Sequence, residues 1–469
     1  MRKRSVYKKT ISIVNETPME MYENLVGKKK GFLLESYDKN YDRYTFFGAE
    51  PEEIITSRGN ALVITAADGT ETIREGNPLE LLKEYYSDFE IVKDADGIHF
   101  PGGLVGNLGY DFVRYTEQLP DDNPDEIGIE TIQMMLMTHF IMVDHVAETL
   151  TAVALEADDE DGRKAAEQAI EKMIEAVRTK TKKTQKPALI HDGRIVKKSD
   201  TLEQYSSKVE KIKAYIRQGH IFQTVLSQRW EIETKQDGFE LYRQLRELNP
   251  SPYLYYFNYG DFEVIGSSPE MIVKQQGSRV YTCPIAGTRK RGRDAAEDER
   301  LRKELLSDEK ERAEHVMLVD LARNDMGRIA EFGSVKVTQF MQVHNYSHVM
   351  HIVSEVEGRK KGEFHPLDLV SSFLPAGTLS GAPKIRAMEI IDELETVRRG
   401  LYGGATGYID FSGNMDFCIT IRTMIKKGDR VYLQAGAGIV ADSVPENEYA
   451  ECCNKVMALA KTLVEEENL

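Results

Sequence analysis

The chain has 469 residues, of which 41% are hydrophobic and 29% charged, and it carries a net charge of −16. This length suits two or three average domains, or one large enzyme with an intimate two-part core, and the composition is that of a globular protein. The strong negative charge repels phosphate backbones and anionic lipid, so neither nucleic acid nor a membrane surface is an expected partner. No apolar run is long enough to span a bilayer, and the basic start MRKRSVYKKT lacks the apolar segment of a signal peptide.

The four cysteines show neither C-x-x-C spacing nor the framework of a secreted disulfide protein. We therefore expect reduced thiols and a cytoplasmic protein. Cys283 precedes a proline, while Cys452 and Cys453 fall in the middle of a predicted helix. None of them resembles the activated cysteine of a glutaminase, so no fused glutaminase is expected.

In chain order, short alternating strands and glycine loops come first, followed by a charged segment from Ala157 to Lys186. That segment predicts an amphipathic helix and then a basic, threonine-rich linker. The apolar positions of the helix, spaced three and four apart, are Ala166, Ile170, Met173, Ile174 and Val177. The linker divides the chain into an N-terminal region, 1–185, and a C-terminal region, 195–469.

After the linker, strands and long helices alternate irregularly. Two segments predict antiparallel hairpins, one turning at Tyr259-Gly260 and the other at Ser412-Gly413-Asn414. Hairpins mixed with helices favour an α+β fold over a parallel doubly wound sheet.

The stretch FLPAGTLSGAPKIRAMEII, from Phe373 to Ile391, predicts a glycine- and proline-rich loop that leads directly into a helix. Thr378, Ser380 and Gly381 come just before Pro383, which favours a first helical turn. Backbone N–H groups at such a helix start can stabilise a carboxylate or a phosphate. Taken alone, the pattern is more typical of an ordinary strand-to-helix connection.

Two further predicted helices carry glutamates three residues apart on one face. Glu311 and Glu314 do so in the first, and Glu448 and Glu451, followed by Lys455, do so in the second. For either helix alone, a solvated face is the better interpretation. If the two faces converged, their oxygen ligands would suit a hard cation such as Mg²⁺. The spacing does not show that they converge.

These segments together resemble the chorismate-utilising enzymes, and most closely the large subunits of anthranilate synthase. The matching motifs are, in order, GHIFQTVLSQRW, NPSPYLYYF, GSSPE, PIAGTRKRG, DEKERAEHVMLVDLARND, YSHVMHIVSEVEG, LPAGTLSGAPK, GLYGGATGYI, IRTM and LQAGAGIVADSVPENEYAE. They cover residues 195–469 almost continuously, whereas the N-terminal match depends mainly on LLES and GNLGYD. The resemblance implies an α+β fold with antiparallel sheets around a common core and flanking helices.

The resemblance also implies a lyase of tryptophan biosynthesis that converts chorismate and ammonia to anthranilate and pyruvate with Mg²⁺ as cofactor. By position, the implied metal ligands are Glu314 and Glu451, with Glu311 and Glu448 as direct or water-mediated support. The implied catalytic residues are Glu270, His351, Glu311 and Thr378. The implied substrate contacts are Gly287, Thr288, Tyr402, Arg422, Gly436, Ala437, Gly438 and Lys455.

Two of the catalytic residues have distinct implied roles. Glu270 matches a general acid for the departing C4 hydroxyl, and this role requires a carboxyl group that its surroundings keep neutral. His351 matches a histidine of the elimination stage. Without the match, an exposed strand-end glutamate and a core histidine would be the better interpretations of these two residues.

One position separates the branches of the family. Relatives that add water have a lysine base where this chain has Gln223, and glutamine cannot deprotonate water, whereas ammonia already carries a lone pair. Ala286 argues against those aminodeoxychorismate synthases that use a lysine nucleophile there, but other members lack this lysine. Aminodeoxychorismate synthase component I, of the folate pathway, is therefore the alternative, and an aminodeoxyisochorismate synthase also stays open.

Two partners follow from the resemblance. Ammonia is expected from a separate glutamine amidotransferase subunit, and L-tryptophan is expected as a feedback inhibitor. Ser36, Pro252, Tyr253 and Leu254 match the tryptophan pocket, although methionine is common at the last position. Region 1–185 is thus interpreted as regulatory and 195–469 as the chorismate-binding catalytic domain.

The sequence also permits two interpretations without catalysis. A degenerate family member could serve as a binding or regulatory subunit, but the implied catalytic set is intact. A basic binding module could use the cluster Arg289, Lys290, Arg291 and Arg293. Since the chain is strongly negative overall, a solvated or substrate-facing loop is the better interpretation of that cluster.

Overall fold

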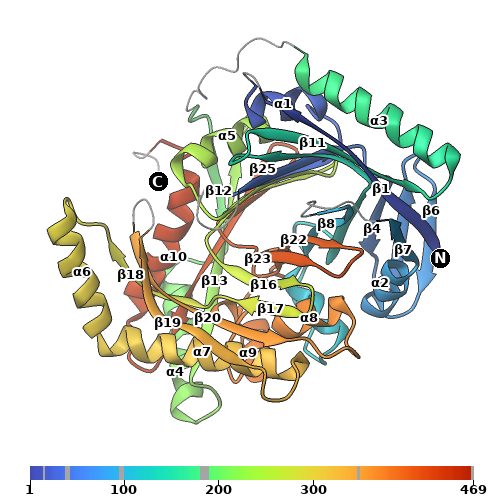
Figure 1. Ribbon diagram of the computed structural model, residues 1–469. Coiled ribbons are helices and arrows are strands. Elements are labelled where there is room, and N and C mark those ends of the chain that lie inside the picture. The colour runs from blue at the N-terminus through green and yellow to red at the C-terminus, as the bar shows by residue number, and fades with distance from the viewer. Residues whose placement is uncertain (14–15, 37–42, 94–99, 180–189, 346–348, 466–469) are drawn as a thin grey trace.

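Two large β-sheets packed face to face form the body of the protein, and helices cover their outer faces (Figure 1). The computed structural model describes residues 1–13, 16–36, 43–93, 100–179, 190–345 and 349–465. Neighbouring strands run antiparallel throughout both sheets, except where β1 (Arg2–Ser12) pairs in parallel with β7 (Phe89–Lys93). The expected α+β fold is confirmed.

The first sheet contains 13 strands. Its order is β12 (Arg194–Lys198), β13 (Gln223–Glu233), β25 (Arg430–Ile439), β24 (Thr423–Lys427), β15 (Glu263–Ser268), β14 (Tyr253–Asn258), β2 (Gly31–Glu35), β3 (Tyr44–Ala49), β10 (His139–Asp144), β11 (Thr149–Ala157), β1 and β7, with β21 (Gly381–Ala382) paired to β13.

The second sheet contains 12 strands. Its order is β18 (Ile285–Lys290), β20 (Val349–Arg359), β17 (Arg279–Thr282), β16 (Met271–Gln276), β23 (Met415–Ile419), β22 (Ala405–Asp410), β8 (Gly103–Leu108), β9 (Ile132–Met137), β4 (Glu53–Ser57), β5 (Ala61–Ala66) and β6 (Glu71–Glu75), with β19 (Lys336–Asn345) paired to β20.

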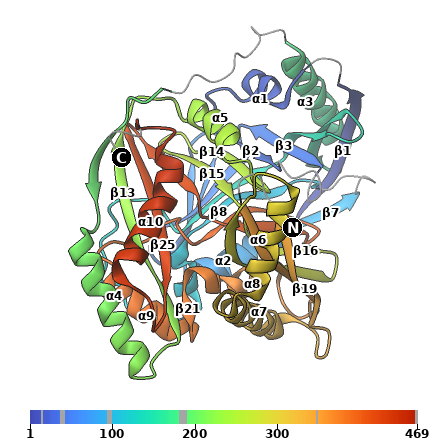
Figure 2. The same ribbon diagram turned by 90° about the vertical axis from the view of Figure 1, so that its left-hand side faces the viewer.

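The helices occupy the outer faces and flanks of these sheets. They are α1 (Pro18–Leu25), α2 (Pro78–Ser87), α3 (Glu160–Arg178), α4 (Leu202–Arg217), α5 (Gly238–Leu248), α6 (Ala295–Ser307), α7 (Glu309–Ile329), α8 (Pro366–Phe373), α9 (Lys384–Leu394) and α10 (Pro445–Ala460), with 3₁₀ turns η1 (Tyr110–Tyr115) and η2 (Gly377–Leu379). Figure 2 shows α4, α9 and α10 on one flank, beside β13 and β25.

Each sheet joins strands from both sides of the predicted linker. In the first, β14 pairs with β2, and in the second, β22 pairs with β8. A shared aromatic core lies between the sheets and includes Phe32 and Phe257 from the first and Tyr408 from the second. Residues 180–189 of the linker lie outside the described residues, so the boundary between 1–185 and 195–469 stays a prediction.

Two local predictions are confirmed. Helix α3 begins after Asp159, whose side chain accepts a hydrogen bond from Gly162 N–H, and it buries the five apolar residues named from the sequence. The two hairpins are β14–β15 and β22–β23, with turns where the sequence indicates them. Among the described residues, no helix combines the length and apolar character that crossing a membrane requires.

Candidate active site

The predicted substrate contacts on β25 lie opposite the first half of β13. Gly436 pairs with Ser227 and Gly438 pairs with Val225. A Cβ atom on Gly436 would lie 3.1 Å from the Tyr402 hydroxyl, and one on Gly438 would lie 2.5 Å from Gln223 Nε2. These two glycines therefore leave room for a tyrosine hydroxyl and a glutamine amide. Between them, Ala437 is buried in the core below, so it presents backbone rather than side chain to this surface.

Gln223, the first residue of β13, is buried beside Gly438. Its Oε1 atom has no hydrogen-bond partner among the residues that the structure describes. A buried acceptor without a partner is costly, so this oxygen is suited to a small donor that enters the site.

Tyr402 and Arg422 lie within electrostatic reach of each other. Burial raises the pKa of Tyr402 and lowers that of Arg422, which also interacts with Glu451. Arg422 adopts a φ of 52°, a left-handed conformation that costs about 1–3 kcal/mol for a residue with a side chain. Such strain is concentrated at functional sites, which agrees with the predicted role of Arg422.

The Glu270 side chain is buried and does not lie at an exposed strand end. The residue is 8% exposed, and burial raises the pKa of its carboxyl group to about 8. Thr378 Oγ1 donates a hydrogen bond to Glu270 Oε1 over 3.2 Å. At neutral pH the carboxyl group is therefore protonated, as a general acid must be before it acts.

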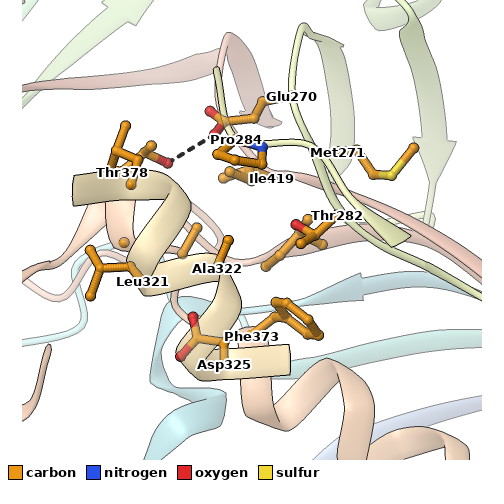
Figure 3. Close-up of a pocket in the computed structure, with 14 residues that line it drawn as sticks. Glu270, Met271, Thr282, Pro284, Leu321, Ala322, Asp325, Phe373, Thr378 and Ile419 are labelled. Atoms are coloured by element: carbon orange, nitrogen blue, oxygen red, sulfur yellow. Dashed lines mark hydrogen bonds between the residues drawn. The ribbon is translucent and has the colours of Figure 1, made fainter. Parts of the chain in front are cut away.

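Figure 3 shows this pair at one end of a cavity, with Leu321, Ala322 and Asp325 of α7 along the opposite wall. The loop that carries Thr378 reaches the cavity through η2 and then leads into α9, which begins at Lys384. The loop-to-helix prediction is thus confirmed. Of the predicted site residues, the lining of this cavity contains only Glu270 and Thr378.

His351, on β20, lies opposite a bulge in β18 at Gly287, which has a φ of 68°. His351 Nδ1 lies 2.9 Å from the Gly287 carbonyl oxygen and 3.1 Å from Thr288 Oγ1. Since a carbonyl only accepts, Nδ1 carries the hydrogen and Nε2 the lone pair. Burial lowers the pKa of His351, so the ring is neutral and can accept a proton.

The glutamates of α7 and α10 repel one another across the site. Burial raises the pKa of Glu314, and the charges of Glu311 and Glu451 raise it further. Burial and Glu451 also raise the pKa of Glu448. The glutamates of the two helices therefore lie within electrostatic reach of each other, and Glu314 and Glu448 are partly buried instead of lying on a solvated face.

Two cations pair with the remaining carboxylates. Lys455 Nζ lies 2.7 Å from Glu451 and donates to the Gly436 carbonyl oxygen over 2.9 Å. Arg289 lies 3.0 Å from Glu311. In the described part of the chain, no group of three or more histidine, cysteine, aspartate or glutamate side chains is gathered closely enough to hold a metal ion. The donor atoms of the four glutamates are all oxygens, and their carboxylates repel one another, so their chemistry fits a hard cation. That they bind a metal stays a prediction.

The four residues predicted to bind tryptophan line a second cavity, between the two sheets. Ser36, Pro252, Tyr253 and Leu254 all belong to its lining. Ser36 Oγ is buried and has no hydrogen-bond partner within the described residues. Asp416, on the cavity wall, accepts a hydrogen bond from the Tyr253 hydroxyl over 2.9 Å.

Comparison with known proteins identifies the family. The family model described as "chorismate binding enzyme" matches residues 29–461. The chain belongs to the chorismate binding enzymes. It is similar to anthranilate synthase component 1 of Acetivibrio thermocellus, with 46% identity over 96% of this chain and 93% of the relative. It is likewise similar to anthranilate synthase component 1 of Bacillus subtilis, with 44% identity over 97% of this chain and 91% of the relative.

Solved structures of chorismate binding enzymes share the fold. Anthranilate synthase component I from Streptococcus pneumoniae matches with a TM-score of 0.80 and 37% identity, over 95% of this chain and 97% of that one. The isochorismate synthase MenF from Escherichia coli matches with a TM-score of 0.74, over 98% of this chain and 95% of that one. At 16% identity, this second likeness shows the fold alone.

The basic cluster begins in the last two residues of β18, and its arginines are paired with acidic side chains. Arg289 pairs with Asp308 and Glu304 as well as Glu311, Arg291 pairs with Asp298, and Arg293 pairs with Glu297. Acidic groups of α6 and α7 thus neutralise three of the four cations. Arg289, through its ion pair with Glu311, is the residue that links the cluster to the predicted site.

Three of the four cysteines of this chorismate binding enzyme are not activated. Burial raises the pKa of Cys283 and of Cys452 to about 12, and it also raises the pKa of Cys418. A nucleophilic cysteine needs the opposite shift.

Proposed function

We propose that this chorismate binding enzyme is the synthase subunit of an anthranilate synthase, a lyase that converts chorismate and ammonia to anthranilate, pyruvate and water. The observation that carries the proposal is the position of Gln223 beside Gly438, with a buried Oε1 that lacks a partner among the described residues. Relatives at 40–46% identity over at least 95% of this chain are named anthranilate synthase component 1, which supports the same conclusion.

In the first stage, ammonia forms a bond to C2 of the ring while the bond from C4 to its hydroxyl group breaks. Glu270 protonates this hydroxyl, which leaves as water. The raised pKa of Glu270 and its contact with Thr378 support this role. Gln223 Oε1 accepts a hydrogen bond from ammonia and orients its lone pair, and no base is needed for the attack.

In the second stage, the aminated ring loses its C2 proton and the enolpyruvyl group, which leaves as pyruvate, and the ring becomes aromatic. His351 accepts the proton at Nε2. Its Nδ1 contact with the Gly287 carbonyl and its lowered pKa support a neutral ring of the required tautomer.

Both side chains and backbone groups bind the substrate. Arg422 and the Tyr402 hydroxyl bind one chorismate carboxylate, since a guanidinium group matches a carboxylate well. The backbone of Gly436 and Gly438 contacts the remainder of the molecule, and Lys455 fixes the Gly436 carbonyl. Glu314 and Glu451, with Glu311 and Glu448, would hold Mg²⁺, which when bound offsets the charge of the ring carboxylate.

Ammonia comes from a separate glutamine amidotransferase subunit. The buried cysteines with raised pKa values support a chain without glutaminase activity. Glutamine and ammonium salt should be compared as nitrogen donors for the purified chain. Only ammonium is expected to support turnover, and equal rates with both would contradict a separate subunit.

L-Tryptophan inhibits the enzyme from the second cavity. Aromatic walls from Tyr44, Phe46 and Tyr253 suit an indole ring. Ser36 and Asp416, which already pairs with Lys274, offer oxygen acceptors for the ammonium group of an amino acid.

The function is tested by coupling turnover to pyruvate detection. With chorismate, Mg²⁺ and ammonium, anthranilate and pyruvate should form in equal amounts. An aminated product without pyruvate would contradict the proposal.

A further inference from the structure

A buried ion pair lies below Tyr402 and includes none of the predicted site residues. The side chains of Arg399 and Glu395 are 1% and 5% exposed. Arg399 Nη2 donates to Glu395 Oε1 over 2.6 Å and Nε donates to Oε2 over 2.9 Å, which makes a two-point contact. Such a contact fixes direction as well as distance.

The same pair holds a loop and a strand. Arg399 Nη1 donates to the Leu379 carbonyl over 2.6 Å, and Nη2 donates to the Val225 carbonyl over 2.8 Å. Glu395 Oε1 accepts hydrogen bonds from Ser227 N–H over 2.9 Å and from Ser227 Oγ over 2.8 Å.

Each residue that this ion pair contacts is a direct neighbour, by strand pairing or in sequence, of a predicted site residue. Val225 and Ser227 pair with Gly438 and Gly436, which the site presents to the substrate. Leu379 directly follows Thr378, whose hydroxyl contacts the Glu270 carboxyl group.

The guanidinium group also packs against two rings. Its central carbon lies 5.6 Å from the centre of the Tyr402 ring and 4.6 Å from that of Tyr110. Cations at such distances are attracted to the ring face. The Tyr402 hydroxyl extends from this ring toward Gly436.

A buried ion pair contributes little net stability, because removing both charges from water costs about as much as their attraction returns. Its geometric effect is stronger, since it joins three parts of the site at one group. We propose that Arg399 and Glu395 are positioning residues, which hold Tyr402, the β25 glycines and the Thr378–Glu270 contact in one arrangement. This inference rests on the proposed function.

Three variants test the inference in the full chain. Arg399→Lys keeps the positive charge and loses the two-point contact. Ser227→Ala removes one hydrogen bond to Glu395 and one from Gln434 Nε2, and it leaves no charge unpaired. Arg398→Lys is the matched control, since this neighbouring arginine is 34% exposed and pairs with Asp121 on the surface. For each, kcat and KM for chorismate are measured with saturating ammonium and Mg²⁺, together with thermal unfolding and the Kd of chorismate by calorimetry.

The folded Arg399→Lys protein should lose about 10- to 100-fold in kcat/KM, with a higher KM and a higher Kd for chorismate. Ser227→Ala should change in the same direction by about threefold to tenfold, and Arg398→Lys should stay within about twofold of wild type. A purely structural role would lower kcat in proportion to the unfolded fraction and leave KM and Kd unchanged.

The inference is overturned if folded Arg399→Lys keeps wild-type kcat/KM and Kd. If Arg399→Lys does not fold, Ser227→Ala is the only test, and wild-type values of kcat/KM and Kd in that variant overturn the inference. A wild-type enzyme that makes another product contradicts the proposed function, while the Kd values for chorismate still judge the positioning role.

Discussion

Thr378 donates its hydroxyl hydrogen to the carboxyl group of Glu270 over 3.2 Å. The contact joins the loop before α9 to the connection between β15 and β16, and these two segments are more than 100 residues apart in the chain. Burial raises the pKa of Glu270, whereas this hydrogen bond lowers it. The balance of the two sets the pH range in which the acid is protonated.

Glu270→Gln should separate catalysis from stability. It removes the acid, so kcat should fall by about 100- to 10,000-fold. The wild-type free energy of unfolding should fall by ~3–5 kcal/mol between pH 4.5 and about pH 8, because the unfolded chain releases this proton near its ordinary pKa of 4.5 and the folded protein keeps it. Glutamine has no such proton, so the variant should unfold at a higher temperature than wild type at pH 8, by calorimetry. Equal melting temperatures there would contradict a buried neutral carboxyl group.

Thr378→Val should move the pH dependence of kcat. Valine keeps the shape of threonine and loses the hydroxyl group that lowers the Glu270 pKa. The alkaline limb of wild-type kcat, which falls as Glu270 ionises near pH 8, should therefore move to higher pH in the variant. The profile must be measured at saturating free ammonia. An alkaline limb that stays in place or moves to lower pH would contradict the role of Glu270 as the general acid.

Glu314→Gln should weaken metal binding and stabilise the metal-free protein. Its carboxylate is repelled by Glu311 and Glu451, so its removal should raise the melting temperature without Mg²⁺. Mg²⁺ affinity measured by calorimetry should fall at least about tenfold, and activity should fall with it. Glu446→Gln, on the exposed face of α10, is the control and should behave as wild type. Unchanged Mg²⁺ affinity in Glu314→Gln would refute the ligand assignment.

His351→Ala should block elimination and spare amination. The variant keeps Glu270 and Gln223 but lacks the base for the C2 proton, so a product that still carries the enolpyruvyl group should accumulate. Mass spectrometry of the reaction mixture distinguishes this product from anthranilate. If anthranilate forms at the wild-type rate, His351 is not the base.

Ser36→Arg should abolish inhibition by tryptophan. The long charged side chain would enter the second cavity, which Ser36 lines together with Pro252 and Tyr253. Inhibition curves for L-tryptophan would be compared with those of Ser12→Arg, an exposed serine on β1. Inhibition that is equal in wild type and both variants would place the inhibitor elsewhere, and no inhibition of wild type would remove the regulatory proposal.

Much of the local structure could be predicted from the sequence. Helix α3 and its buried face follow from apolar residues at helical spacing, and the hairpins follow from turn residues between alternating strands. Both signals are confined to a few neighbouring residues. The order of strands in the two sheets has no such signal, because an alternating strand pattern does not identify its partner.

The site was predicted less completely, for the same reason. Glu270 alone looks like an exposed strand end, and its burial depends on α7 and the Thr378 loop. Arg399 was missed, since its partners Leu379 and Val225 are 20 and 174 residues away. The adjacent pair Arg398-Arg399 gives no indication that one is exposed and the other buried.

The most direct test of the account is product identity with isotopically labelled ammonium. The purified chain would be incubated with chorismate, Mg²⁺ and the label at alkaline pH, and the products separated by mass spectrometry. Labelled anthranilate and an equal amount of unlabelled pyruvate are expected. Unlabelled isochorismate, or a labelled product that retains the enolpyruvyl group, would contradict it.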